Sequence, residues 1–250
     1  MRAMVYCAGL GTRLAPLTFA TPKPALLVRG RPLIASTLDW LAAAGVTQVF
    51  ANTHHLAAVM KRVLYESLPA GVSLTVSHEP VLLGTGGGLC GARPHFGPVW
   101  AHDPLLVVNG DAFIEAEPTL VEDLVRSHAE RRPLATLWLS GDPRARELAN
   151  VDVDDRGAII RIAGQGIELN TRSTAMTYLG LQVVDDRFIE WLAEHLPASG
   201  VGCVKDHGWI PALLAGKPVH GIGLGGITWD IGTPERYAAV NAVPIAAVDS

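Results

Sequence analysis

Residues 9–24 read GLGTRLAPLTFATPKP and follow a short apolar run, residues 3–7, that predicts a buried strand. Glycines directly after a strand let the main chain approach a ligand closely, because no Cβ stands in the way. Arg13 offers a planar fork for phosphate oxygens, and Lys23 offers a compact point charge between two prolines. Backbone N–H groups and these two cations together predict a site for a chain of phosphates.

Two known glycine-loop motifs match this stretch less well. A dinucleotide-binding fingerprint needs a glycine three positions after Gly11, where the chain has Leu14. A Walker loop needs G-K-[ST], and the only Gly-Lys pair, residues 216–217, is followed by proline. A purely structural turn could use the glycines but would not call for Arg13 and Lys23. Phosphate binding is therefore the preferred interpretation.

Composition narrows the class of protein. The chain has 250 residues, 49% of them hydrophobic, and a mean hydropathy of +0.27, which favours a well-filled globular core. It has no run of 18 apolar residues and opens directly into a strand, so we expect no membrane span, no signal peptide and a cytoplasmic location. A net charge of −4 predicts no nucleic-acid partner. Three cysteines without C-x-x-C spacing predict neither disulfides nor a zinc site.

Strand and helix patterns alternate along the first half of the chain. We expect strands at residues 3–7, 46–51, 72–77 and 105–108, and helices at 32–44, 55–67 and 88–93. In the second half we expect strands at 134–139, 151–153, 158–162 and 176–184, a loop at 164–173, helices at 187–196 and 207–214, and a helix from Pro234 capped by Thr233. This alternation predicts an α/β fold with a doubly wound, mixed but mainly parallel sheet, and ligands at the carboxyl ends of its strands.

Two aspartates are candidate metal ligands. Asp111, in Asn109-Gly110-Asp111, comes directly after the apolar strand at 105–108 and should point into the ligand crevice. Asp230 ends a strand-like run in the segment WDIGTP, just before a capped helix. Mg²⁺ favours one or two such carboxylates together with phosphate oxygens. Either aspartate could instead be an ordinary turn residue.

A third segment, residues 84–88, reads GTGGG and follows Glu79 at a short distance. Its bare backbone could lie against a flat base and ribose. A flexible or tight-turn loop is the alternative interpretation.

Together these segments resemble the sugar-1-phosphate nucleotidyltransferases. The family signature G-x-G-T-R-L-x-P-L-T-x-x-x-P-K-P is matched at each fixed position of residues 9–24, and the resemblance covers nearly the whole chain. It implies one Rossmann-like nucleotidyltransferase domain over residues 1–250. Residues 1–115 would mainly bind the nucleotide, and residues 116–250 would contain a small subregion that mainly binds the sugar phosphate.

The resemblance also implies a set of site residues. Arg13, Lys23 and Asp111 would be catalytic, and Asp111 and Asp230 would hold the cofactor Mg²⁺. The GTGGG segment is similar to the family's base-contacting loop, and Gly180 looks like the glycine under the bound sugar. The implied ligand-binding positions are Ala8, Gly9, Gly11, Thr12, Glu79, Gly84, Thr85, Gly86, Asn109 and Gly180.

The implied reaction is one in-line displacement, in which the sugar 1-phosphate attacks the α-phosphorus of a nucleoside triphosphate and pyrophosphate leaves. Arg13 would hold the β- and γ-phosphates, and Lys23 would bridge the α-phosphate and the incoming phosphate. The expected partners are these two substrates, without nucleic acid or membrane, and the expected assembly is a monomer or homodimer. A non-catalytic nucleotide-sugar-binding regulatory protein is the alternative of another class, although such proteins usually lack one of the charged residues that this chain retains.

The substrates remain open between two branches. The short chain and its GTGGG segment look most like enzymes that activate N-acetylmuramic acid 1-phosphate with UTP, while mannose- or heptose-1-phosphate guanylyltransferases are close alternatives. Many relatives carry E-K-P before the sugar segment, whereas residues 161–168 of this chain contain no lysine. Either Arg161 or Arg172 substitutes for that lysine, or the acceptor lies differently.

Overall fold

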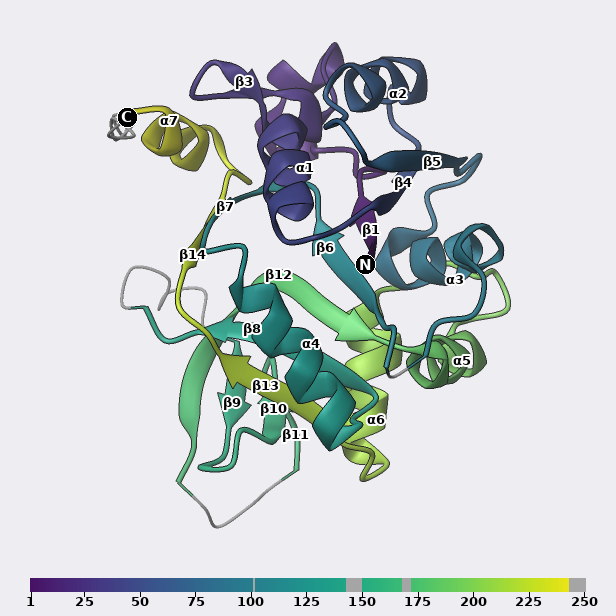
Figure 1. Ribbon diagram of the computed structural model, residues 1–250, viewed down its shortest axis with the longest axis vertical. Coiled ribbons are helices and arrows are strands. Elements are labelled where there is room, and N and C mark those ends of the chain that lie inside the picture. The colour runs from purple at the N-terminus through teal and green to yellow at the C-terminus, as the bar shows by residue number, and fades with distance from the viewer. Residues whose placement is uncertain (101, 143–149, 168–171, 243–250) are drawn as a thin grey trace.

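The computed structural model describes residues 1–100, 102–142, 150–167 and 172–242, and its centre is one mixed β-sheet (Figure 1). Its parallel half has the order β6-β1-β4-β5, formed by Leu105–Asn109, Arg2–Tyr6, Gln48–Thr53 and Ser73–His78. Parallel neighbours bring their carboxyl ends to the same edge of a sheet. That edge therefore carries residues from the ends of β1, β4 and β6.

The other half of the sheet is mostly antiparallel. The long strand β12 (Thr174–Val184) pairs with β6 along one side and with β8 (Ala135–Ser140) along the other. Next to β8, β13 (Val219–Gly223) runs parallel to it. Three short strands extend from the start of β12: β9 (Val151–Val153), β10 (Ile159–Ile162) and β11 (Gln165–Gly166). The mixed sheet with its helices confirms the predicted α/β class.

Helices cover both faces of the sheet, as a doubly wound fold requires. One face packs against α1 (Leu33–Ala43), α2 (Ala57–Glu66) and α4 (Leu120–Arg131). The opposite face packs against α3 (Gly84–Phe96), α5 (Asp186–His195) and α6 (Ile210–Leu214). Successive residues of a strand point to opposite faces, so Ala3 and Val5 enter the first core and Met4 the second. This double burial explains the almost continuous apolar sequence of β1 and β6.

A small antiparallel ribbon stands beside the main sheet. It pairs β7 (Ala112–Glu115) with β14 (Ile227–Asp230), with Asp230 directly opposite Ala112. After β14, α7 (Pro234–Ala242) packs by Val240 on the hairpin of β2 (Leu27–Val28) and β3 (Arg31–Pro32). The ribbon therefore joins the end of the described chain to the carboxyl end of β6.

The structure corrects the expected loop at residues 84–88, which forms the first turns of α3. Glycine normally disfavours a helix, but these glycines allow close contact with the backbone of residues 200–202. A Cβ at Gly87 would lie 2.1 Å from the carbonyl oxygen of Gly200, and one at Gly84 would lie 2.6 Å from that of Gly202. Close packing between two backbones therefore requires glycine here.

Other differences concern helices and strands whose sequences show only a weak local pattern. The sequence interpretation omitted α4, β7 and β13, and the expected helix at 207–214 begins earlier, with a π-helical turn at Lys205–Trp209. Part of the expected loop at 164–173 forms β11, and its residues 168–171 lie outside the described residues.

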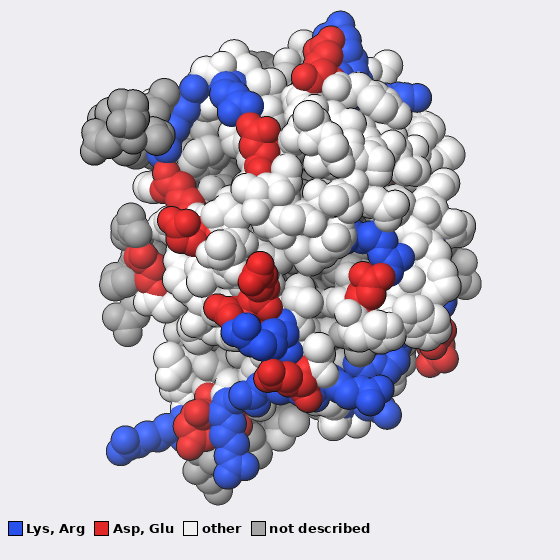
Figure 2. Space-filling model, in the orientation of Figure 1, with Lys and Arg blue, Asp and Glu red and all other residues white. Residues whose placement is uncertain are grey.

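Charged side chains of both signs are interspersed on the face shown in Figure 2, notably over α4, where Arg126 pairs with Asp123. Among the helices that the structure describes, none combines the length and apolar character needed to cross a lipid bilayer.

Candidate active site

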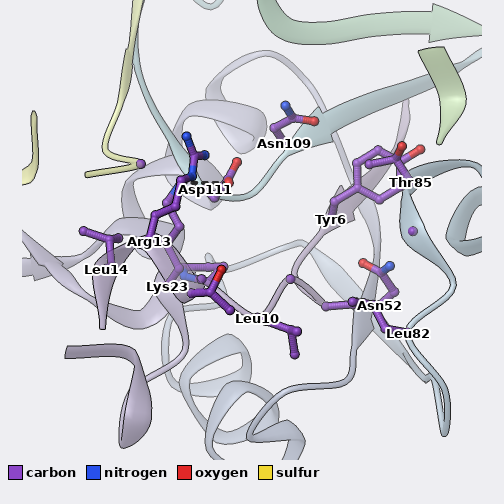
Figure 3. Close-up of a pocket in the computed structure, with 17 residues that line it drawn as sticks. Tyr6, Leu10, Arg13, Leu14, Lys23, Asn52, Leu82, Thr85, Asn109 and Asp111 are labelled. Atoms are coloured by element: carbon purple, nitrogen blue, oxygen red, sulfur yellow. Dashed lines mark hydrogen bonds and ion pairs between the residues drawn. The ribbon is translucent and has the colours of Figure 1, made fainter. Parts of the chain in front are cut away.

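A cleft of about 410 Å³ opens at the carboxyl ends of β1, β4 and β6 (Figure 3). This is the edge at which ligands bind in open α/β sheets. Its lining residues are Tyr6, Ala8, Gly9, Leu10, Gly11, Thr12, Arg13, Leu14, Lys23, Pro24, Asn52, Leu82, Gly84, Thr85, Asn109, Asp111 and Gly232. Most of the residues expected from the sequence are therefore brought together.

The glycine loop has a fixed shape at Gly11. Its φ of +65° lies in the left-handed region, and a Cβ there would stand 2.8 Å from Cγ2 of Thr18. The Thr18 hydroxyl donates a hydrogen bond of 3.0 Å to the carbonyl oxygen of Gly11, and Nε2 of His55 donates to the carbonyl oxygen of Thr18 over 2.7 Å. Gly9, by contrast, has open space where its Cβ would be. The loop is thus held from behind and bare towards the cleft.

Lys23 links the two candidate metal ligands. Its Nζ lies 2.9 Å from Oδ2 of Asp111 and 3.7 Å from Oδ1 of Asp230, while the lysine side chain is only 7% exposed. Two prolines flank Lys23, which begins a short 3₁₀ turn. A buried ammonium needs charged partners, and here two carboxylates provide them.

Asp230 reaches this position through the β7–β14 ribbon. The ribbon places Asp230 opposite Ala112, which directly follows Asp111. A Cβ at Gly232 would lie 2.7 Å from Oδ1 of Asp230 and 2.9 Å from Nη2 of Arg13, so the guanidinium and this carboxylate face the same small space. Arg236 also contacts Asp230, with Nη1 2.7 Å from Oδ2. The four charged groups expected from the sequence therefore converge.

This arrangement fits a magnesium ion. Two carboxylates already face one cationic centre, and carboxylate oxygens are the protein ligands that Mg²⁺ prefers. Within the described part of the chain, no group of three or more His, Cys, Asp or Glu side chains is placed to hold a metal. Mg²⁺ commonly keeps water and substrate phosphate oxygens at its remaining positions, so two carboxylates are enough.

A row of side chains crosses the sheet under the cleft. Tyr6 stands in register with Asn52 on β4 and with Asn109 on β6. Gly180, on β12, lies next to Asn109: its φ is +83°, and a Cβ there would come within 3.1 Å of the Asn109 amide nitrogen. Gly180 does not line the cleft itself; its missing side chain leaves room for Asn109.

Glu79 lies behind the cleft wall rather than in it. The residue is 3% exposed, and its carboxylate accepts hydrogen bonds from Nδ2 of Asn52 at 2.6 Å and from the backbone N–H of Leu83 at 3.0 Å. Asn52 in turn accepts a 2.9 Å hydrogen bond from the N–H of Cys7. Glu79 therefore connects the ends of β1 and β4 to the start of α3.

The start of α3 faces two directions. Gly84 and Thr85 line the cleft, whereas the N–H of Gly86 donates to the carbonyl oxygen of Gly202 at 2.8 Å. The Thr85 hydroxyl accepts a hydrogen bond from the N–H of Val204 at 2.9 Å. Segments 84–86 and 202–204 therefore form one wall.

The sequence interpretation did not include Tyr6 or Asn52 among the site residues. Both stand at or near the carboxyl end of a parallel strand, and that position is the signal that could have identified them. Burial raises the pKa of the Tyr6 hydroxyl well above its usual range, and the neighbouring Tyr178 adds to the shift. Leu10, Leu14, Pro24, Leu82 and Gly232 are further lining residues that were not predicted.

Neither arginine suggested as a replacement for the family's lysine lines this cleft. Arg161 lies on β10, opposite Gly166 of β11, and Arg172 is exposed. Glu168, in the same region of the sequence, lies outside the described residues.

Known proteins resemble this chain in sequence and in fold. An N-acetylmuramate α-1-phosphate uridylyltransferase of Neisseria meningitidis is 38% identical over 57% of this chain and 60% of its own length. A mannose-1-phosphate guanylyltransferase of Mycobacterium tuberculosis is 34% identical over 62% of this chain and 42% of its own length. The chain thus spans about half the length of these relatives. The crystal structure of HddC from Yersinia pseudotuberculosis with GMP-PN shares the fold, with a TM-score of 0.76 at 18% identity, over 96% of this chain and 97% of that one.

The family model described as nucleotidyl transferase matches residues 2–164. That segment contains the glycine loop, Lys23, the start of α3 and Asp111, which together form most of the cleft. Because the match spans more than half of the chain, this protein belongs to the nucleotidyl transferase family.

Proposed function

We propose that this chain transfers a nucleotidyl group from a nucleoside triphosphate to a sugar 1-phosphate and releases pyrophosphate. The position of Lys23, between Asp111 and Asp230 in a cleft lined by the glycine loop, carries the proposal. Such a cluster offers bare backbone, two cations and two metal-binding carboxylates to a chain of phosphates. The relatives named above, which act on sugar 1-phosphates, support the same reaction.

The chain's own residues act mainly by orientation and charge. Arg13 binds the β- and γ-phosphates and offsets the charge that develops on pyrophosphate. Lys23 holds the α-phosphate and the acceptor phosphate together despite their repulsion. An acceptor phosphate oxygen forms a bond to the α-phosphorus while the bond to the bridging oxygen breaks, and its electron pair leaves with pyrophosphate. The attacking oxygen is already anionic, so no general base is needed.

Asp111 and Asp230 would hold Mg²⁺ for this reaction. When bound, the metal would supply positive charge that offsets the negative charge of the reacting phosphates. Lys23 contacts both of these carboxylates, so its ammonium lies beside the oxygens that would bind the metal.

UTP and an N-acetylmuramate 1-phosphate-like acceptor are the preferred substrates of this proposal, because the Neisseria relative carries out that uridylyl transfer. The alternative substrate pair is GTP with mannose 1-phosphate or with a heptose 1-phosphate. The Mycobacterium relative, a mannose-1-phosphate guanylyltransferase, supports the pair with mannose 1-phosphate. A cytoplasmic monomer or homodimer that makes precursors for cell-wall or surface polysaccharides would suit either reaction.

A matrix of substrates tests the proposal directly. The purified chain would be incubated with UTP, GTP, ATP, CTP or dTTP against N-acetylmuramate, mannose, heptose or glucose 1-phosphate, with pyrophosphate release as the readout. We expect release with at least one pair and its loss when a chelator removes divalent metal. Release with GTP alone would reject the UTP preference but keep the reaction class. Nucleotide binding without release from any pair would favour a non-catalytic, regulatory protein instead.

The two aspartates can be tested separately from turnover. Asp111→Asn and Asp230→Asn should each weaken binding of Mn²⁺ in the presence of nucleotide, measured by electron paramagnetic resonance. Asp111→Asn should also lower turnover on the order of 100-fold, as the loss of one preorganised charged group does. Asp39→Asn is the matched control, because Asp39 lies exposed on α1 and pairs only with Arg31 among the described residues. Metal binding unchanged in both site variants would reject their role as ligands.

A further inference from the structure

The glycine loop is held from behind by His55, a residue that does not itself line the cleft. Nε2 of His55 lies 2.7 Å from the carbonyl oxygen of Thr18, and the Thr18 hydroxyl lies 3.0 Å from the carbonyl oxygen of Gly11. A carbonyl oxygen can only accept a hydrogen bond, so Nε2 of His55 carries a proton and donates it. Two successive hydrogen bonds therefore connect the turn before α2 to the glycine loop.

The carbonyl oxygen of Gly11 is the point at which this connection meets the loop. It also accepts a 2.9 Å hydrogen bond from the backbone N–H of Leu14, which closes the short 3₁₀ turn Thr12–Leu14. A carbonyl oxygen has two lone pairs, and here each has a donor. Arg13 lies inside the turn and lines the cleft. The backbone that carries Arg13 therefore depends on a carbonyl group that Thr18 holds.

The segment that carries Thr18 has little else to hold it. Within residues 15–21 only Thr18 is buried, at 2% exposed, whereas Phe19 is 73% exposed and Leu17 is also exposed. Among the described residues, the hydrogen bond from His55 is the one that joins this segment to a part of the chain outside residues 9–24. A segment with few buried apolar contacts opens easily unless such bonds hold it. Loss of the His55 bond would therefore loosen Thr18 and, through it, the Gly11 carbonyl.

The turn from β4 into α2 holds His55 in this position. Leu56, the next residue, has a φ of +49°, in the left-handed region that leucine rarely adopts. Such a strained conformation persists only where surrounding contacts outweigh its cost, and it is found most often at functional sites. The preceding histidine, His54, serves another segment, because its Nδ1 lies 2.8 Å from the carbonyl oxygen of Glu79. Of these two adjacent histidines, His55 is thus the one that supports the glycine loop.

We propose that His55 is a positioning residue for the nucleoside triphosphate: through Thr18 it keeps the glycine loop in its binding shape before the nucleotide arrives. A loop that is ordered in advance binds more tightly, because less conformational freedom is lost on binding. This inference rests on the proposed function, because it requires the triphosphate to lie along the glycine loop and Arg13. It concerns the nucleotide rather than the acceptor, since the connection ends at the loop that would bind the triphosphate.

The variant His55→Phe removes the donor and keeps a ring. We expect the Kd for UTP or GTP, measured by calorimetry, to rise about tenfold, the equivalent of one hydrogen bond, while the KM for the acceptor at saturating nucleotide stays the same. The amide of His55→Gln can donate from nearly the same position and should restore most of the affinity. His195→Phe is the matched control, since it removes a 2.8 Å bond of the same kind, to the carbonyl oxygen of Trp191 on the exposed side of α5. It should change neither constant.

A double-variant cycle tests whether the two hydrogen bonds act in series. Thr18→Val removes the hydroxyl and keeps the shape of the side chain, so it should weaken nucleotide binding to a similar extent. The double variant His55→Phe/Thr18→Val should then bind the nucleotide little more weakly than either single variant, because each substitution breaks the same connection. If His55→Phe does not fold, Thr18→Val provides the test with His55 in place.

Each other outcome overturns the inference. Unchanged nucleotide affinity in a folded His55→Phe or Thr18→Val protein rejects it and leaves the proposed function standing. An equal loss in His55→Gln would reject the hydrogen bond as the cause, and additive losses in the double variant would reject the connection through Thr18. If the unmodified chain binds a nucleotide but releases no pyrophosphate from any substrate pair, the proposed function fails while the affinity measurements still decide this inference. If it binds no nucleoside triphosphate, both fail.

Discussion

Nζ of Lys23 lies 2.9 Å from Oδ2 of Asp111, across 88 positions of sequence, in a site where the lysine is nearly buried. The pair is extended by Asp230 at 3.7 Å, so one ammonium is shared by two carboxylates from distant segments. The ammonium therefore offsets part of the negative charge of the two carboxylates. A bound phosphate chain would give the ammonium new anionic partners, and a divalent metal would give the two carboxylates a new cationic partner.

Replacing Lys23 by methionine should lower turnover on the order of 100-fold or more, because the α-phosphate and the acceptor phosphate would lose the cation between them. Pyrophosphate release under saturating substrates measures the effect. Lys61→Met, on the exposed side of α2, should be close to the unmodified protein. Near-normal turnover of Lys23→Met would show that the ammonium is not part of the chemistry.

Replacing Glu79 by glutamine should destabilise the fold by about 1–3 kcal/mol. Both carboxylate oxygens accept hydrogen bonds, from Asn52 and from Leu83, and the glutamine NH₂ group would face one of these donors. Urea unfolding measures the change. Glu66→Gln, exposed on α2, should have almost no effect. Equal stability of the two variants would contradict the role of Glu79 in joining β4 to α3.

Replacing Gly180 by alanine should both strain the backbone and displace the side chain of Asn109. The strain costs about 1–2 kcal/mol for a residue forced into the left-handed region. Gly216→Ala is a matched control, since Gly216 has a φ of +68° but open space around its Cβ. We expect similar losses of stability from the strain, with a loss of kcat/KM only in Gly180→Ala. Equal kcat/KM in both variants would contradict the importance of Asn109.

Stability should fall as the pH is lowered from about 6.5 to about 4, partly because of His220. Burial lowers the pKa of His220 to about 4, and the positive charge of Arg131 adds to this shift. The unfolded chain therefore binds this proton more readily than the folded one within that window, and the contribution of His220 is fully present above it. The loss is at most about 3 kcal/mol, since one pKa unit corresponds to about 1.4 kcal/mol.

The contribution of His220 can be isolated by substitution. In His220→Gln, the free energy of unfolding should depend less on pH between 4 and 6.5 than it does in the unmodified chain, because the group that takes up the proton is gone. The control variant His102→Gln changes an exposed histidine, and its free energy of unfolding should depend on pH as it does in the unmodified chain. Identical slopes in all three proteins would remove His220 as a source of the pH dependence.

The parallel half of the sheet could be predicted closely. Residues 3–7 were expected as a strand, and β1 covers Arg2–Tyr6; the expected strand at 105–108 corresponds to β6, Leu105–Asn109. Continuous apolar runs bounded by glycine or polar residues are a local signal that double burial imposes. The signature at residues 9–24 likewise identified the loop that lines the cleft.

Other parts of the fold depend on contacts that no local pattern reports. The glycines at 84–88 favour a loop by propensity, yet they form a helix because the backbone of residues 200–202 packs against them. The short strand β7 exists because β14 pairs with it from more than a hundred residues away. Sequence proximity gave no indication of either contact.

The amino-acid sequence by itself determined the α/β class, the phosphate loop and the identity of the four charged groups, since strand burial and glycine geometry are local properties. Only the tertiary structure decided that Lys23 stands between Asp111 and Asp230 and that Glu79 supports the wall instead of lining the cleft. It also decided that the Tyr6 hydroxyl is buried without a partner among the described residues. Distances between side chains on separate strands depend on pairing register and backbone packing, which form when the whole chain folds.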